Sequence, residues 1–154
     1  MSSSKLRLRH ARQLMSFLLG IDAEAYLPDD CVVEVSPSTG KIRRLWVDGK
    51  VLATVRPVDG RISLTLEGAR RLAQLLGGMR YRVVVGEKGE ARVRDGFDVS
   101  PADILAVDEL IVAGEEVLVF NQSGELLAVG RAVMSGEEMK RVKRGTAVKV
   151  RHKV

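Results

Sequence analysis

The chain has 154 residues, with 25 Lys and Arg against 20 Asp and Glu, so its formal net charge is +5 at pH 7. A single cysteine excludes an intrachain disulfide framework and a thiolate metal cluster, and two histidines argue against a multi-histidine metal site. No apolar run reaches the roughly 20 residues that span a bilayer, and no signal-peptide pattern follows the basic start. We therefore expect a cytoplasmic protein with no cofactor, no metal and no membrane partner.

The first half of the chain predicts a helix, an antiparallel meander and a second helix. Apolar residues recur at helical spacing over 6–19, and Gly20 can end that helix. Alternating apolar residues, with a hairpin signal at Asp48-Gly49, predict strands at 32–35, 42–47, 51–55 and 62–64. Thr65 caps a second helix that runs to about Leu76. Gly77-Gly78 marks the predicted boundary between a domain of 1–78 and a domain of 79–154.

The second half is expected to consist mostly of strands. We predict them at 81–85, 91–94, 116–120, 126–132 and 146–150, with a turn at 87–90. Ser100-Pro101 begins a short helix, and Ser135 begins a helical turn that ends near Lys143. Gly130 inside a strand indicates a bulge or a close backbone approach. The fold class is therefore α+β: a small N-terminal α/β domain followed by a pseudo-barrel of about six strands, because closure protects sheet edges.

Three stretches of the second half resemble a known family. They are AGEEVLVFN (113–121), GELLAVGRAVMSGEEM (124–139) and KRGTAVKVRH (143–152), and their order and spacing resemble PUA domains, which are small RNA-binding barrels. The stretch STGKIRRLWVDGKVLATVRPVDGRISLTLEGARRL (38–72) resembles the domain that precedes the PUA domain in archaeosine tRNA-guanine transglycosylases and related stand-alone archaeal proteins. The catalytic barrel of those enzymes, with its aspartates and zinc cysteines, has no counterpart in this sequence. The resemblance therefore implies RNA binding and argues against base exchange by this chain alone.

Basic residues without acidic neighbours gather at the end of the chain. We call residues 140–154 the C-terminal basic segment, because they contain seven Lys and Arg and no Asp or Glu. Guanidinium forks fit phosphate oxygens, and alternation on a strand places Lys149 and Arg151 on one outer face with Val148 and Val150 toward the core. A solvated strand face is the alternative, which the acid-free run disfavours. The predicted RNA contacts in this segment are Lys143, Arg144, Lys149, Arg151 and His152.

Three further arginines are candidates for RNA contact outside this segment. Arg92 and Arg94 alternate with Val93 on the predicted strand at 91–94, so they either extend the basic surface or face water. Arg131 either contacts RNA or pairs with Glu115 or Glu116, and the sequence favours neither interpretation. Adjacent arginines in the first half are expected to form surface salt bridges, some with Glu67 or Asp59.

The scarcity of aromatic residues bears on the mode of RNA recognition. Proteins that read single strands stack bases on Phe, Tyr or Trp, but only six aromatic residues occur in this chain. We expect Trp46, Tyr81 and Phe120 in the core and Phe97 as the one candidate for exposed stacking. The composition therefore favours recognition of the backbone and shape of folded RNA.

No catalytic residue is predicted. His10 and His152 lie in basic surroundings without a neighbouring nucleophile, and acidic neighbours discourage a thiolate at Cys31. The leading hypothesis is a non-catalytic protein that binds structured RNA, tRNA first and rRNA second. The alternatives are a detached tRNA-binding subunit of an RNA-modifying enzyme and a translation- or ribosome-associated adaptor. Asn121 is the only asparagine, and avoidance of thermolabile amides is typical of thermophilic proteins.

Overall fold

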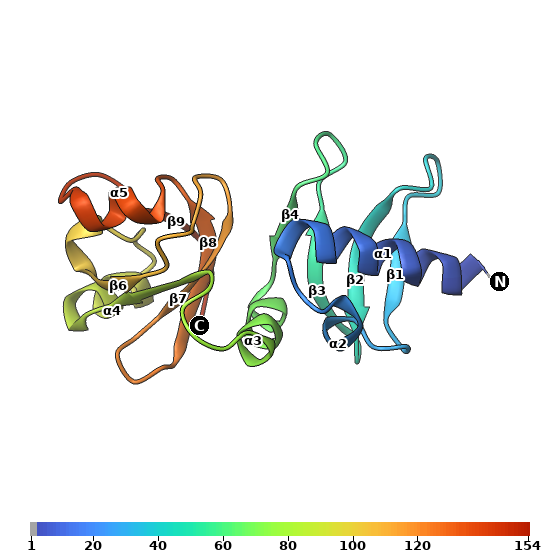
Figure 1. The fold of residues 1–154 in the computed structure, drawn as a ribbon, viewed down its shortest axis with the longest axis horizontal. Helices are drawn as coiled ribbons and strands as arrows, with labels where there is room; N and C mark the ends of the chain where they lie inside the picture. Colours follow the sequence, from blue (N-terminus) through green and yellow to red (C-terminus); the bar gives the residue numbers. More distant parts are fainter. Residues whose placement is uncertain (1–2) are drawn as a thin grey trace. The chain divides into compact units, whose positions relative to one another are not determined.

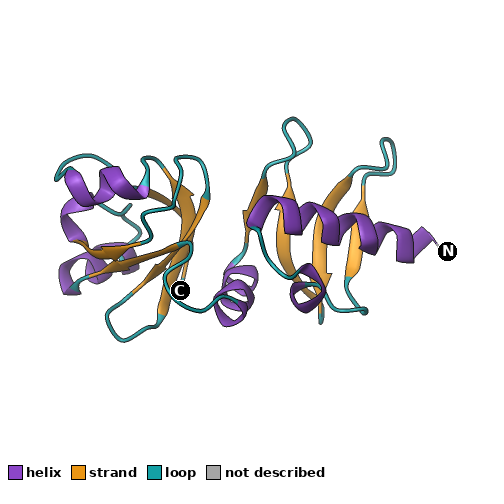
Figure 2. Cartoon of the chain, viewed as in Figure 1, coloured by secondary structure: helices purple, strands orange, loops and turns teal. Residues whose placement is uncertain are grey.

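The computed structural model describes residues 3–154 and divides the chain into two compact units, one ending at Leu76 and the other beginning at Gly77. Each unit contains one sheet and its own helices (Figures 1 and 2). The α+β class predicted from the sequence is confirmed.

The sheet of the first unit is a four-stranded antiparallel meander in the order β1-β2-β3-β4. The hairpin predicted at Asp48-Gly49 is present, and both residues have the positive φ (51° and 76°) that a tight two-residue turn requires. The four strands are β1 (Val32–Val35), β2 (Ile42–Val47), β3 (Lys50–Val55) and β4 (Ile62–Leu64).

Three helices pack on this sheet: α1 (Ser3–Leu19), α2 (Ala23–Tyr26) and α3 (Leu66–Leu75). The long α1 crosses the strands and contacts β1, whereas α3 contacts β3 and β4 (Figure 1). The short α2, which the sequence analysis did not predict, lies between them and buries Tyr26, whose hydroxyl donates to the carbonyl of Gly68 at 2.9 Å. Gly68 must be glycine, because a Cβ there would lie 1.9 Å from the carbonyl oxygen of Leu52. As predicted, Thr65 caps α3 by accepting from Gly68 N–H at 3.1 Å.

The second unit contains a five-stranded sheet in the order β6-β5-β7-β8-β9, in which β5 and β7 are parallel and the other neighbours are antiparallel. Its core comprises inward-facing residues such as Val83, Val117, Val119 and Val148. The strands are β5 (Arg82–Val85), β6 (Ile104–Val107), β7 (Glu116–Phe120), β8 (Leu126–Ala132) and β9 (Val148–Lys153). The helices are α4 (Glu87–Arg94), the 3₁₀ turn η1 (Pro101–Asp103) and α5 (Gly136–Arg141).

The prediction of a turn at 87–90 and a strand at 91–94 is wrong, because both lie in α4. The glycine that indicated a turn, Gly89, lies inside the helix, where a Cβ would approach the Cβ atoms of Asp103 and Val85 to 2.8 and 2.9 Å. Close packing therefore requires glycine at this position despite its poor helix propensity. Within residues 3–154 this sheet has five strands, not about six, and β6 was not predicted.

Gly130 occupies an irregularity between β8 and β9, as the sequence predicted. Val129 pairs with His152 and Gly130 pairs with Val150, so Arg151 is the extra residue of a bulge in β9. A Cβ on Gly130 would lie 2.2 Å from the carbonyl oxygen of Lys149. The glycine thus allows close contact of the two strands where the bulge places Arg151.

A buried carboxylate, Asp108, ties the start of the second unit to the loop that precedes β7. Its Oδ2 accepts from Arg80 Nη1 at 2.6 Å and from Tyr81 N–H at 2.8 Å, and its Oδ1 accepts from Leu110 N–H at 2.9 Å. Burial alone would raise the pKa of Asp108, but the hydrogen bonds from Tyr81 N–H and Arg80 outweigh it and hold the pKa below its ordinary value.

We expect Asp108→Asn to destabilise the folded protein by about 1–3 kcal/mol at pH 7, because the amide nitrogen must face a donor in place of one carboxylate oxygen. A lowered folded-state pKa stabilises the protein above the unfolded pKa of about 3.9, and this stabilisation is lost as pH falls through the folded-state value. Urea unfolding at pH 7 and below pH 3 measures the free energy of unfolding of the unmodified protein and of Asp108→Asn. The difference between the two proteins should therefore be smaller below pH 3 than at pH 7. An equal difference at both pH values would contradict this role of the charge.

Candidate nucleic-acid interface

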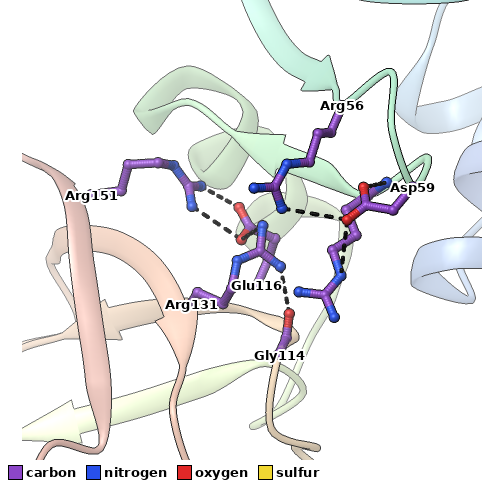
Figure 3. Close-up of polar contacts among 7 residues, drawn as sticks. Arg56, Asp59, Gly114, Glu116, Arg131 and Arg151 are labelled. Atoms are coloured by element: carbon purple, nitrogen blue, oxygen red, sulfur yellow. Dashed lines mark hydrogen bonds and ion pairs between the residues drawn. The ribbon is translucent and has the colours of Figure 1, made fainter.

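Glu116 holds two of the predicted RNA-contacting arginines. In the sheet register Glu116 on β7 lies opposite Arg131 on β8, which lies opposite Lys149 on β9, so the three side chains form one row on one face. Glu116 accepts from both terminal nitrogens of Arg151, from Nη1 at 3.2 Å, and Arg131 Nη2 lies 3.4 Å from Glu116 Oε2 (Figure 3). Arg131 Nη1 also donates to the carbonyl of Gly114 at 2.5 Å.

In this Glu116 cluster (Glu116, Arg131 and Arg151), the ion pair that was one interpretation of Arg131 is present, and its contact with RNA stays a prediction. The Glu116 side chain is only 3% exposed, and each guanidinium belongs to a side chain that is 27% exposed. One carboxylate between two guanidiniums leaves a formal charge of +1. Arg131 and Arg151 are thus held in fixed orientations by internal contacts, and Lys149 beside them adds a further exposed charge.

Arg92 and Arg94 lie on a helix rather than on a strand, so the prediction that they share a strand face is wrong. Arg94 pairs with Glu90 one turn earlier at 2.8 Å. Arg92 lies 3.6 Å from Asp103 and 5.2 Å from the ring centroid of Phe97. Residues two apart point to different sides of a helix. Each arginine is therefore matched by a local carboxylate, and Phe97, although 54% exposed, is stacked with Arg92.

The remaining four candidates carry exposed polar side chains. Lys143 and Arg144 lie in the loop between α5 and β9, Lys149 lies on β9, and His152 lies beyond the bulge. Among residues 3–154 none of the four has a carboxylate partner, whereas Lys140 in the same basic segment pairs with Glu109 at 2.5 Å. The unneutralised charge of the C-terminal basic segment thus lies at the end of α5 (Arg141), in the loop at 143–144 and on β9.

Three exposed apolar side chains near this loop were missed by the sequence analysis: Leu110, Val112 and Val133, which are 51–70% exposed. Their loops are joined to each other and to the basic loop by backbone hydrogen bonds, since Gly136 N–H donates to Ile111 and Val133 N–H donates to Ala147. The sequence could have indicated their exposure, because all three residues lie outside the regular strands. Such a surface can pack against the apolar faces of sugars and bases while the cations contact phosphates.

Several arginines of the first unit form ion pairs at the surface. Arg70 pairs with Glu67 at 2.7 Å, as expected. Asp59 pairs instead with Arg56 at 3.3 Å (Figure 3) and with Arg61 at 3.7 Å. These side chains are 37–62% exposed, and such pairs typically contribute about 0.2–1 kcal/mol each.

Comparison with known proteins identifies both units. Residues 81–154 match the PUA domain family, and residues 9–78 match the patch-forming domain C2 of tRNA-guanine transglycosylase. Residues 81–154 therefore form a PUA domain. The resemblance that the sequence analysis described is thereby confirmed for both halves.

Relatives extend over both matched regions. The tRNA-guanine(15) transglycosylase of Thermococcus onnurineus is 43% identical over 125 residues, which are 81% of this chain and 22% of that enzyme. The tRNA-guanine(15) transglycosylase of Methanothermobacter thermautotrophicus is 37% identical over 145 residues, which are 94% of this chain and 22% of that enzyme. The chain thus spans about a fifth of the length of the curated relatives it matches. These relatives are archaeal and include thermophiles, in agreement with the amide-poor composition.

A solved structure of a hypothetical protein from Pyrococcus horikoshii superimposes on this PUA-domain protein with a TM-score of 0.74 at 29% identity. The match covers 97% of this chain and 91% of that one, so the order of the two domains is shared. Within residues 3–154 no three His, Cys, Asp or Glu side chains are grouped as a metal site, and no helix is long and apolar enough to cross a membrane.

Proposed function

We propose that this PUA-domain protein binds structured RNA, with tRNA as its first target, and that it does not itself catalyse a reaction on that RNA. The observation that carries the proposal is the set of cations without carboxylate partners on the PUA domain at Lys143, Arg144 and Lys149. The boundary near residue 78 would then separate a PUA domain that docks on RNA from an N-terminal domain that supports it.

Electrostatic docking follows from the chemistry of these side chains. Arg144 offers a planar fork that fits two phosphate oxygens, and Lys143 and Lys149 act as point charges. All three are exposed, so contact with phosphate requires little additional desolvation. Tyr81 and Phe120 are buried, at 3% and 5% exposure, which favours recognition of backbone and shape over base stacking on these rings.

The absence of catalysis is supported by the state of the single cysteine, Cys31. Burial raises the pKa of the Cys31 thiol above its ordinary value, so that the thiol remains protonated at neutral pH. The choice of tRNA is supported by the relatives, which are named tRNA-guanine(15) transglycosylases and share 37–49% identity with this chain.

A filter-binding titration of the full chain with tRNA at 50–400 mM salt tests the proposal. Each phosphate contact with duplex RNA or DNA contributes a slope of about −0.9 to the plot of log affinity against log salt, so three or four contacts predict roughly −3. A flat salt response, or equal affinity for a non-nucleic acidic polymer, would rule the proposal out.

A second candidate function is that of a detached tRNA-binding subunit of an RNA-modifying enzyme such as a tRNA-guanine transglycosylase. It is favoured by the similarity to those enzymes, which extends over both matched domains but over only about a fifth of their length. Co-purification of the tagged full chain with a partner that exchanges guanine in tRNA would support it. Binding to tRNA with no such partner at native expression would count against it.

A further inference from the structure

The single tryptophan lies partly exposed on the sheet of the N-terminal domain and not in the core, where the sequence analysis placed it. Trp46 Nε1 donates to Glu34 Oε1 at 3.1 Å, and Arg44 Nη1 donates to Glu34 Oε2 at 2.8 Å. The indole N–H and Arg44 together lower the pKa of Glu34, which keeps it ionised at neutral pH. These contacts fix the orientation of the indole ring.

Beside this ring is a cavity of about 500 Å³. Its six lining residues include three carboxylates and no basic side chain, in a chain whose net charge is +5. Val32, on the edge strand β1, adds an apolar surface that is 61% exposed. The lining residues are Asp30, Val32, Glu34, Trp46, Asp48 and Gly49.

Two of the three carboxylates are available to a ligand. Glu34 is engaged by Trp46 and Arg44, but Asp30 and Asp48 have no hydrogen-bond or ion-pair partner within the described part of the chain. Asp48 is held in the left-handed turn of the β2–β3 hairpin, at φ 51°. A Cβ added to Gly49 would meet nothing within 4 Å, so the cavity is open beside this turn.

We propose that the Trp46 cavity binds a basic side chain, arginine in preference to lysine, of a partner protein. A guanidinium stacks on an indole face through cation–π attraction, Asp30 and Asp48 supply the countercharge, and the aliphatic stem packs on Val32. The same carboxylates repel phosphates, so the cavity is unsuited to the RNA that the PUA domain contacts. The proposal is independent of the proposed function and adds a protein-binding site to a different domain.

Trp46 is the only tryptophan, so its fluorescence reports directly on this cavity. We would titrate the full chain at low salt with the peptide Gly-Arg-Gly-Arg-Gly, whose two termini are blocked so that they carry no charge. The expected result is a saturable change in Trp46 emission, about 5–10-fold weaker in Asp48→Asn and weaker again when Asp30→Asn is added. Asparagine tolerates the left-handed conformation, so the hairpin turn is retained.

The matched control is Glu24→Gln, which removes an equal charge from an exposed residue of the same domain that does not line this cavity. It should leave peptide binding unchanged. Unchanged binding in Asp48→Asn, equal weakening in Glu24→Gln, or an equal response to a Gly-Glu-Gly-Glu-Gly peptide would overturn the proposal. Equally strong binding of spermidine would overturn the assignment to a protein side chain, and displacement of the peptide by tRNA would overturn the separation from RNA binding.

Discussion

Replacing Lys143, Arg144 and Lys149 together by alanine is expected to weaken tRNA binding about 100-fold at low salt. Each exposed phosphate contact contributes on the order of 1 kcal/mol, and 1.4 kcal/mol corresponds to a factor of ten. The slope of log affinity against log salt should become less steep by about one for each phosphate that the variant no longer binds. Because the three side chains are exposed and have no carboxylate partner within residues 3–154, the fold should be unaffected. Filter binding measures the affinity, and circular dichroism checks the fold.

A triple variant with the same change in charge separates a site from general attraction. Arg7, Lys41 and Lys88 are exposed and have no carboxylate partner in the described residues, and they lie outside the C-terminal basic segment. Their joint replacement by alanine should cost only a few-fold in affinity, through the lower net charge. Equal decreases in affinity for the two triple variants would contradict a binding site in the basic segment.

Local patterns were sufficient for most of the strands. Strands β1, β2, β4, β7 and β8 begin and end where alternation and turn residues indicated, and Thr65 caps its helix. The failures occur where tertiary packing overrides a local signal. Gly89 resembles a turn glycine, but its lack of a Cβ serves the contact of α4 with Asp103 and Val85.

For the candidate site, the sequence predicted where basic residues are concentrated, but not which of them are neutralised. The acid-free run at 140–154 identified the basic segment, but which of its cations are neutralised depends on residues far away in the sequence. Arg151 reaches Glu116, 35 residues earlier, because a bulge opposite Gly130 changes its position on β9. Arg131 lies opposite Glu116 because of the register between β7 and β8. That register depends on an irregularity between Val119 and Phe120, which the sequence does not reveal. Sequence alone therefore could not separate paired from available arginines.

The pairing around Glu116 leads to the largest expected effect on stability. Glu116→Gln is expected to lower the free energy of unfolding by about 3 kcal/mol, because removal of one member of a buried ion pair typically costs about 3–5 kcal/mol. The lower end applies since the side chains of Arg131 and Arg151 are each 27% exposed and water can solvate part of their charge. For a unit of this size the change corresponds to a decrease in melting temperature of about 10–20 °C, which calorimetry of the full chain would measure.

Glu109→Gln is the matched control, because Glu109 pairs with Lys140 where both side chains are more than half exposed. Glu109→Gln should lower the free energy of unfolding by less than about 1 kcal/mol. The same Glu116→Gln variant separates the structural from the RNA-binding role of the two arginines: the folded variant gains a net positive charge beside Lys149, so its affinity for tRNA should stay equal or rise while its melting temperature falls. A parallel decrease in affinity and stability, measured below the melting temperature, would instead mean that the cluster's internal geometry is itself part of the RNA interface.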